Sequence, residues 1–191
     1  MKIGVYVGSF NPVHKAHIAL VNYLLNNNYL DKVIIVPTGD YWNKQNLINI
    51  DDRINMLKFY ENDDIIINNE LNNMPYTYQI IEKLQINYHN DQLLLIIGSD
   101  NIEKFHLWKN YEQLLQNEVL VIPRGKYKLN KNINKELRNS FKIITNYKTY
   151  NISSSLIRNK FINNDLNDIL NLIDINIYEY IIENNLYKNM E

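Results

Sequence analysis

Six short apolar runs, separated by helical or polar sequence, set the main constraint on how this 191-residue chain can fold. Their residues are aliphatic or β-branched with few polar interruptions, which is the pattern of strands buried on both faces of a parallel sheet. The runs are KIGVYV (2–7), KVIIVP (32–37), DIIIN (64–68), QLLLIIG (92–98), EVLVIP (118–123) and FKIIT (141–145).

Helical patterns lie between these runs. Ile18, Val21 and Leu25 share one helix face after the first run, and two more helices are predicted over about 51–60 and 76–88. Strands that alternate with helices imply right-handed βαβ crossovers. We therefore expect an α/β fold, Rossmann-like, with a doubly wound parallel sheet.

From residue 152 onward the pattern is helical only. We expect these C-terminal helices, over about 152–187, to pack back on the sheet through one apolar stripe. We find neither a linker-like segment nor an internal repeat, so a single domain over 1–191 is predicted, which is long enough to bury a sizeable core. The stripe consists of Leu166, Ile169, Leu170, Ile173, Ile177, Tyr180 and Ile181.

Charge and cysteine content exclude several classes of function. The net charge of -1 gives no global field for nucleic acid or an anionic membrane, so a polyanion should bind at a local site. Without cysteine the chain has no disulfide, thiolate metal site or cysteine nucleophile, which is compatible with a reducing cytoplasm. The chain starts without a targeting pattern, and its apolar stretches stay shorter than about 18 residues. We expect a cytoplasmic protein with no membrane segment.

The stretch GSFNPVHKAH, residues 8–17, joins the first strand to the first helix. In a sheet of this type ligands bind beyond the carboxyl ends of the strands, where helix N–H groups favour an anion. Gly8 allows close approach of the backbone, Pro12 fixes the entry angle, and His14 and His17 share one helix face. The stretch therefore predicts a phosphate site.

The two histidines are candidate catalytic residues. Imidazole, with an unperturbed pKa of about 6.5, donates hydrogen bonds to phosphate oxygens and takes up positive charge beside a phosphate. The pair can thus stabilise charge that develops on a phosphoryl group. In the alternative interpretation, His14 only caps the helix and His17 is a surface residue or a core residue with satisfied hydrogen bonds.

A second candidate anion site is NISSSLIR, residues 151–158. Ser153, Ser154 and Ser155 can cap a helix and offer hydroxyl and amide donors, and Arg158 supplies a planar fork suited to phosphate oxygens. The alternative is an ordinary serine cap followed by a solvated arginine.

Both motifs resemble those of a nucleotidyltransferase superfamily, GxFxPxHxxH and ISSTxIR, in the expected order and roughly 135 residues apart. The superfamily holds the nicotinate and nicotinamide mononucleotide adenylyltransferases, pantetheine-phosphate adenylyltransferase and several cytidylyltransferases. This chain departs mildly, with Ala16 for the usual Gly and Ser155 for the usual Thr. The resemblance implies that ATP is bound by Gly8, Ser9, Phe10, Lys44, Gly98, Asp100, Ile152, Ser153 and Ser154.

The segment 93–127 resembles the GxDN…F..W region of nicotinate mononucleotide adenylyltransferases, which a Pro-Arg pair follows. Asp100 is placed to accept hydrogen bonds from ribose hydroxyls, and Trp108 to stack on a flat ring; the alternatives are a helix N-cap and a core residue. PYTYQIIEKL, 75–84, is similar to the helix start that these enzymes place by the pyridine nucleotide. The implied pyridine nucleotide contacts are Asn11, Thr77, Trp108 and Arg124.

One stretch departs from the bacterial nicotinate enzymes, which commonly carry PPHK after the second strand. Residues 36–57 read VPTGDYWNKQNLINIDDRINML, more like the corresponding run of eukaryotic nicotinamide-type enzymes. This run places Lys44 where its charge can reach the triphosphate or the attacking phosphate. Trp42 either contacts a ring or covers the loop.

The resemblance implies adenylyl transfer from ATP to nicotinate mononucleotide, or also to nicotinamide mononucleotide, giving a dinucleotide and pyrophosphate in NAD biosynthesis. The attacking phosphate is already an anion and needs no general base. Mg²⁺ should accompany ATP, held mainly by phosphates and water rather than by a carboxylate cage. Alternatives are another phosphorylated acceptor such as phosphopantetheine, CTP in place of ATP, or a non-catalytic nucleotide-binding module.

Replacing His17 with alanine should lower turnover by roughly 10²-fold or more, the scale for losing one preorganised donor that stabilises developing charge. Pyrophosphate release measures the effect, with circular dichroism to show that the variant folds. A folded His17→Ala protein with near-normal turnover would remove this residue from the chemistry.

Overall fold

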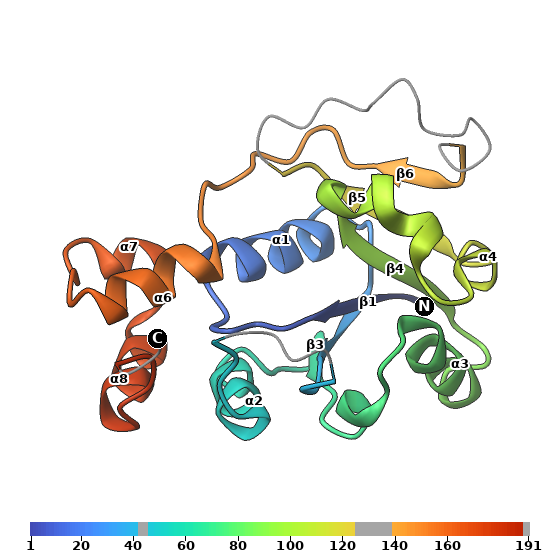
Figure 1. Ribbon diagram of the computed structural model, residues 1–191. Helices are drawn as coiled ribbons and strands as arrows, with labels where there is room; N and C mark the ends of the chain where they lie inside the picture. Colours follow the sequence, from blue (N-terminus) through green and yellow to red (C-terminus); the bar gives the residue numbers. More distant parts are fainter. Residues whose placement is uncertain (42–45, 125–138, 189–191) are drawn as a thin grey trace.

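Six parallel strands form one sheet in the order β3-β2-β1-β4-β5-β6. The computed structural model describes residues 1–41, 46–124 and 139–188, and Figure 1 shows their arrangement. Because the strand order runs outward in both directions from the β1–β4 pair, the sheet has the reversal that defines the Rossmann-like fold, as predicted. The strands are β1 (Lys2–Gly8), β2 (Lys32–Pro37), β3 (Ile65–Ile67), β4 (Gln92–Gly98), β5 (Glu118–Ile122) and β6 (Phe141–Ile143).

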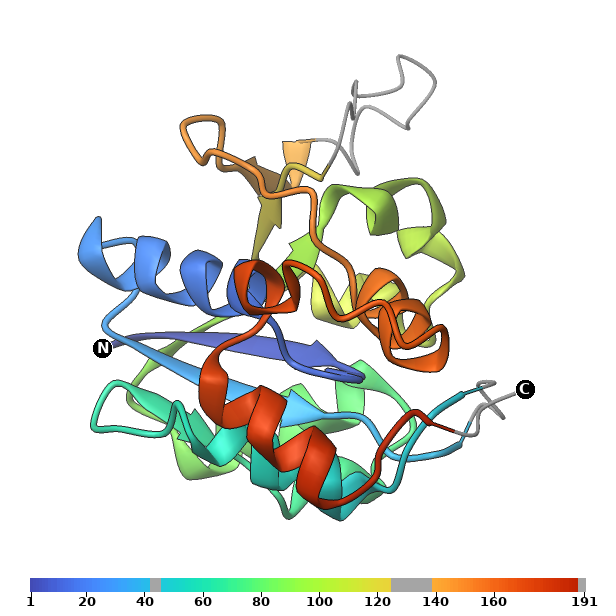
Figure 2. The same ribbon diagram turned by 90° about the vertical axis from the view of Figure 1, so that its left-hand side faces the viewer.

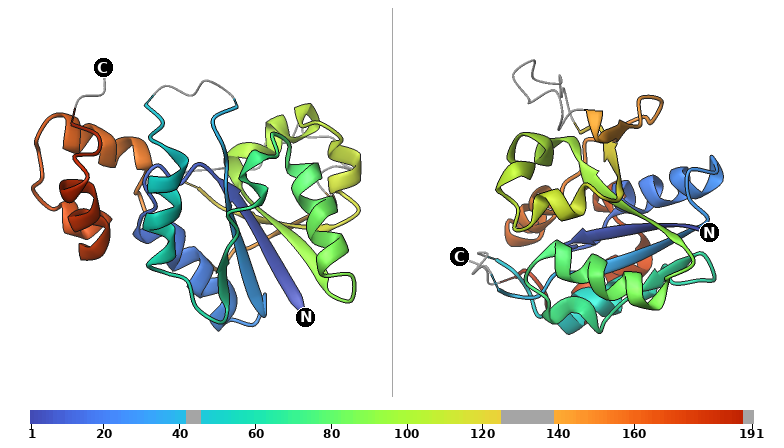
Figure 3. Two further views of the ribbon diagram at one scale, coloured as in Figure 1. Left: turned by 90° about the horizontal axis from the view of Figure 1, so that it is seen from below. Right: turned by 90° about the vertical axis from the view of Figure 1, so that its right-hand side faces the viewer.

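Helices cover both faces of the sheet (Figure 3). Neighbouring residues of β2 show this burial: Val33 and Ile35 belong to one core cluster, and Ile34 and Val36 to the other. This is why the strand runs are apolar without alternation. The helices before residue 152 are α1 (Lys15–Asn26), α2 (Ile50–Lys58), η1 (Leu71–Asn73), α3 (Thr77–Asn87), η2 (Ser99–Leu107) and α4 (Tyr111–Leu114).

The C-terminal helices are α6 (Ser154–Ile162), α7 (Ile169–Leu172) and α8 (Ile175–Glu183). Their isoleucines share one core cluster with strand residues, and their main contacts are with the helices on that face: α7 contacts α1 and α8 contacts α2, beyond the carboxyl ends of the strands (Figures 1 and 2). Helices α1 and α2 already occupy that face of the sheet. Within the described residues, no helix is long and apolar enough to cross a membrane.

The apolar stripe of these helices is mostly buried, but Leu170 is 46% exposed and does not belong to it. Four isoleucines enter the same core cluster as α1 and α2: Ile169, Ile173, Ile177 and Ile181. Two hydroxyls add polar contacts to α2 and its end: Tyr60 donates to Asp174 Oδ2 at 2.6 Å, and Tyr180 donates to Asp52 Oδ1 at 2.9 Å. The C-terminal helices are therefore integral to the core.

Ile177→Ala should lower the free energy of unfolding by about 2–5 kcal/mol, because it removes a side chain that is fully buried between α8 and the rest of the core. Ile175→Ala, on the same helix but 50% exposed, is the matched control and should change it by no more than about 0.5 kcal/mol. Urea unfolding followed by circular dichroism measures both. Equal losses for the two variants would contradict the packing of α8.

Candidate active site

The loop that follows β1 brings the two histidines together at the carboxyl edge of the sheet. It turns at Phe10, whose φ of 46° lies in the left-handed region, and His14 then takes the N-cap position of α1. The His14 N–H donates to Nδ1 of His17 at 3.3 Å. Their rings stack with centroids 3.6 Å apart. His14 thus occupies the cap position and still shares one face with His17.

Burial keeps both imidazoles neutral. Burial first, then the Arg124 charge, lowers the pKa of His14 to about 3. Burial likewise holds the pKa of His17 well below its usual value, with His14 and Arg124 adding to the effect. Nδ1 of His14 is buried and has no hydrogen-bond partner within the described part of the chain. The pair is therefore uncharged at neutral pH in the free protein.

The second motif contacts the first one directly. Ser154 Oγ donates to the Pro12 carbonyl at 2.9 Å, and Arg158 Nη1 donates to the Asn11 carbonyl at 2.8 Å. Ser153 is the N-cap of α6, and its hydroxyl accepts from the Leu156 N–H at 3.2 Å. Segments that are far apart in the sequence thus form one site, as the two motifs predict.

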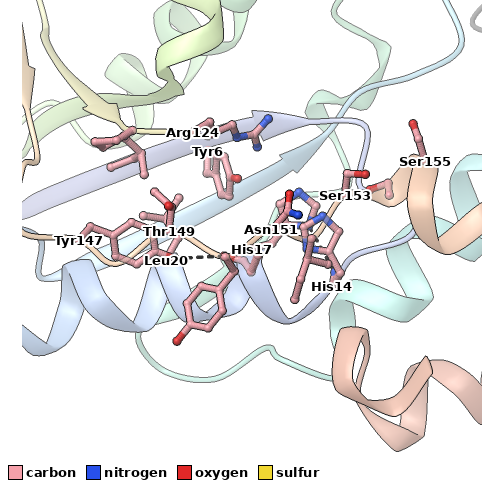
Figure 4. A pocket seen from close by; sticks show the side chains of 16 residues that line it. Tyr6, His14, His17, Leu20, Arg124, Tyr147, Thr149, Asn151, Ser153 and Ser155 are labelled. Carbon is pink, nitrogen blue, oxygen red and sulfur yellow. Dashed lines mark hydrogen bonds between the residues drawn. The ribbon is translucent and has the colours of Figure 1, made fainter. Parts of the chain in front are cut away.

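Two cavities meet at this site. The first, of about 400 Å³, lies between α1, the end of β5 and residues 147–155 (Figure 4). The second, of about 530 Å³, lies above the carboxyl ends of β1, β2 and β4. Their linings share Tyr6, His17, Arg124 and Ser154. A ligand in either cavity therefore lies against His17.

Most of the predicted site residues line one or both cavities. The first cavity holds His14, His17, Arg124, Ile152, Ser153 and Ser154. The second holds Gly8, Ser9, Phe10, His17, Thr77, Gly98, Trp108, Arg124 and Ser154. Trp108 is half-buried against Phe105, with ring centroids 5.1 Å apart, and so combines a packing contact with a face toward the cavity.

Arg158 and Asp100 lie near the cavities without lining them. The Arg158 guanidinium is bonded to the Asn11 carbonyl and, through Nη2, to Ser155 Oγ at 3.2 Å. Asp100 is exposed and pairs with Arg124 at 3.6 Å, and it is not a helix N-cap because Gly98 takes that position. A Cβ at Gly98 would clash with Asp100 Oδ1.

The Asn11 side chain points away from both cavities. Its Nδ2 donates to the Asn46 carbonyl at 2.6 Å, and its Oδ1 accepts from Tyr187 Oη at 3.0 Å and from the Ile48 N–H at 3.4 Å. These bonds hold the loop from behind. Lys44, predicted near the phosphates, lies outside the described residues, as does Trp42.

The sequence analysis missed two residues of the site. Tyr6 lies between the cavities on β1, and the only signal for it was a hydroxyl in an otherwise apolar strand. Arg53 is fully buried beneath the loop that joins β1 to α1, residues 9–14, which we call the phosphate loop. Nothing in the sequence around Arg53 predicted this burial. Within the described ranges, no group of three or more acidic or histidine side chains could hold a metal ion.

Comparison with known proteins agrees with this geometry. Residues 5–160 match the cytidylyltransferase-like family. Proteins named "Probable nicotinate-nucleotide adenylyltransferase" are 34% identical in Borreliella burgdorferi, over 98% of this chain and 97% of that protein, and 36% identical in Fusobacterium nucleatum, over 91% and 93%. The Plasmodium falciparum nicotinic acid mononucleotide adenylyltransferase complexed with NaAD superposes with a TM-score of 0.83 at 27% identity, covering 100% of this chain and 99% of that one.

Similarity of this extent establishes the class: the chain is a nucleotidyltransferase of the cytidylyltransferase-like family. Within that class its relatives match along nearly the whole length. The chain belongs to the nicotinate-nucleotide adenylyltransferases.

The low pKa of His14 makes stability depend on pH. In the unfolded chain His14 takes up a proton near pH 6.5, but in the folded protein it does so only near pH 3. The contribution of neutral His14 to the free energy of unfolding is therefore complete above pH 6.5 and is lost as the pH falls toward 3. Between pH 7 and pH 5 the wild type should lose about 2 kcal/mol more unfolding free energy than His14→Asn, which keeps a favoured N-cap residue. Urea unfolding at the two pH values measures it, and parallel losses would refute the neutral assignment.

Proposed function

We propose that the protein transfers the adenylyl group of ATP to nicotinate mononucleotide and releases pyrophosphate, a step of NAD biosynthesis. The observation that carries this proposal is that two cavities share His17 in their linings. We assign one cavity to each substrate. Two solved structures of the Plasmodium falciparum enzyme support it, one complexed with NaAD and one with APC, the latter with a TM-score of 0.80 and 26% identity. A chain without cysteine also fits a cytoplasmic location, which we include in the proposal.

The reaction needs positioning and charge stabilisation rather than proton abstraction, because the attacking phosphate is already an anion. The α-phosphate of ATP would lie at the junction of the cavities, against His14 and His17. Both imidazoles are neutral in the free protein, and the negative charge of the bound phosphates favours their protonation. A donor pair that gains positive charge as the substrates bind would stabilise the charge that builds up on the α-phosphoryl group.

The leaving pyrophosphate would be held at the start of α6. There Ser153 and Ser154 line the first cavity, and the helix N-terminus favours an anion. Arg158 would add its charge from the junction of the two motifs, and we retain Lys44 as a further cation. Asp100, through its pairing with Arg124, would hold the adenosine, since Arg124 lines both cavities. Gly98 lines only the second cavity and would therefore lie on the acceptor side.

Enzymes of this family use ATP and typically a divalent metal, and we propose Mg²⁺. The site offers hydroxyl, imidazole and guanidinium donors, and the described residues hold no cluster of metal-binding side chains. The phosphate oxygens and water would therefore bind the ion, as Mg²⁺ prefers. Bound in this way, Mg²⁺ would neutralise charge on the triphosphate.

The acceptor would occupy the second cavity, which continues into a smaller one of about 270 Å³. Thr77 and Trp108 line both, so a pyridine ring could stack on the indole. Lys109 lines the smaller cavity, and Thr77 begins α3 there with the positive end of the helix dipole. An ammonium group and a helix N-terminus both favour a carboxylate, which supports nicotinate over nicotinamide as the pyridine.

A screen of pyrophosphate release should show the highest kcat/KM with ATP and nicotinate mononucleotide, ahead of nicotinamide mononucleotide, phosphopantetheine or CTP. Lys109→Gln should lower kcat/KM for the nicotinate substrate by about fivefold, the effect of roughly 1 kcal/mol for a partly exposed ion pair. The nicotinamide substrate should change little.

The matched control is Lys104→Gln, an exposed lysine of η2 that lines neither the acceptor cavity nor its extension. Faster turnover of phosphopantetheine or CTP would replace the proposed substrates. Tight ATP binding without pyrophosphate release for any acceptor would instead indicate a non-catalytic nucleotide-binding module.

A further inference from the structure

Arg53 is a charged side chain with no exposed surface, and it lies on α2 beneath the phosphate loop. Its Nη1 donates to two carbonyls, that of Ser9 at 2.9 Å and that of Thr38 at 2.6 Å. Its Nε donates to the Ile48 carbonyl at 3.1 Å, and its Nη2 pairs with Asp40 Oδ1 at 2.9 Å. Four of the five guanidinium donors are thus used, on acceptors from three segments of the chain: residue 9, residues 38–40 and residue 48.

These bonds join the ends of two neighbouring strands. Where β1 and β2 end, the Thr38 N–H donates to the Gly8 carbonyl at 2.8 Å, and the Thr38 hydroxyl lies 3.5 Å from the Ser9 hydroxyl. Arg53 then holds the carbonyls of Ser9 and Thr38 on one nitrogen. The guanidinium therefore sets the backbone that carries both hydroxyls.

Ser9 and Thr38 both line the second cavity and neither lines the first. The other end of the same loop is fixed separately, since Ser154 and Arg158 bond the carbonyls of Pro12 and Asn11. The loop therefore has two independent supports. Arg53 supports the part of the loop that lines only the second cavity, whereas α6 supports the part beside Ser154, which lines both cavities.

Arg53 carries a buried positive charge. Burial lowers its pKa, yet a guanidinium stays protonated at any physiological pH. Its carboxylate partner Asp40 is 59% exposed, so water screens the negative charge more than the buried positive one. The buried positive charge therefore lies behind the Ser9 carbonyl.

We propose that Arg53 is a positioning residue for the acceptor, fixing the wall formed by Ser9 and Thr38 against which the attacking 5′-phosphate binds. This inference rests on the proposed function, because it takes the second cavity as the acceptor site. Arg53 acts through the backbone carbonyls that it bonds and itself touches no substrate.

Arg53→Lys keeps the charge but cannot reach all four acceptors with one ammonium group. It should raise the KM for nicotinate mononucleotide by about tenfold, because a displaced wall misplaces the phosphate, while the KM for ATP stays within about twofold. Steady-state pyrophosphate release measures both constants. An equal rise in the two constants, or no rise in either, would overturn the proposal.

Met56→Ala is the matched control, because Met56 is fully buried on the same helix and contacts the core. It should lower the melting temperature and leave both KM values unchanged. Thr38→Val, assayed at 10 °C alongside Arg53→Lys, keeps the carbonyl and removes only the hydroxyl of the wall. It should raise the acceptor KM alone; an unchanged acceptor KM in this variant too would overturn the proposal even where Arg53→Lys fails to fold.

Wild-type turnover of nicotinate mononucleotide tests the proposed function by itself. The ratio between variant and wild type tests the positioning role, and it is measured with whichever acceptor the wild type uses. If the substrate assignment fails, the wild type does not turn over nicotinate mononucleotide. If the Arg53 inference fails, the ratio of acceptor KM values between variant and wild type stays near one.

Discussion

The site depends on the hydrogen bonds that attach the start of α6 to the loop after β1. Ser154 and Arg158 donate to the carbonyls of Pro12 and Asn11, which are buried or partly buried backbone acceptors. Backbone carbonyls of this kind need partners, so the contact both satisfies the loop and fixes where the serine-rich helix start lies. Without it, the histidines and the second motif would be separate features of the chain rather than walls of one cleft.

The stacked histidines show how the same packing sets the chemistry. Burial lowers the pKa of both imidazoles, and the Arg124 charge adds to the effect. Because the ring centroids are 3.6 Å apart, a charge on His14 lowers the pKa of His17 further. The unliganded protein thus keeps the pair neutral while Arg124 supplies the charge that faces both cavities. In the proposed reaction, charge neutralisation would be divided between this permanent cation and a histidine pair that gains charge when phosphate binds.

The sequence predicted the parts of this structure that follow from local pattern. Strands buried on both faces leave continuous apolar runs, so the sheet was predicted closely. The order and residue types of the two motifs predicted that they meet, which they do through Ser154 and Arg158. An apolar stripe shows that a helix face is buried but not against which elements, so it did not predict that α7 contacts α1 and that α8 contacts α2. Arg53 was missed because a charged helix residue is ordinarily exposed. Asn11 was expected at the pyridine nucleotide, but its side chain bonds Asn46, Ile48 and Tyr187, which lie far along the chain.

Tyr187 links the C-terminal region to the loop after β1. Its buried hydroxyl reaches Asn11, 176 positions earlier, at the loop that carries the two histidines. The last turns of the polypeptide are therefore part of the scaffold behind the substrate cleft and not a dispensable tail. Proteolysis that removes Tyr187, or a bulky fusion partner that displaces it, would break its bond to Asn11 and so change the conformation of the phosphate loop, near the other end of the sequence.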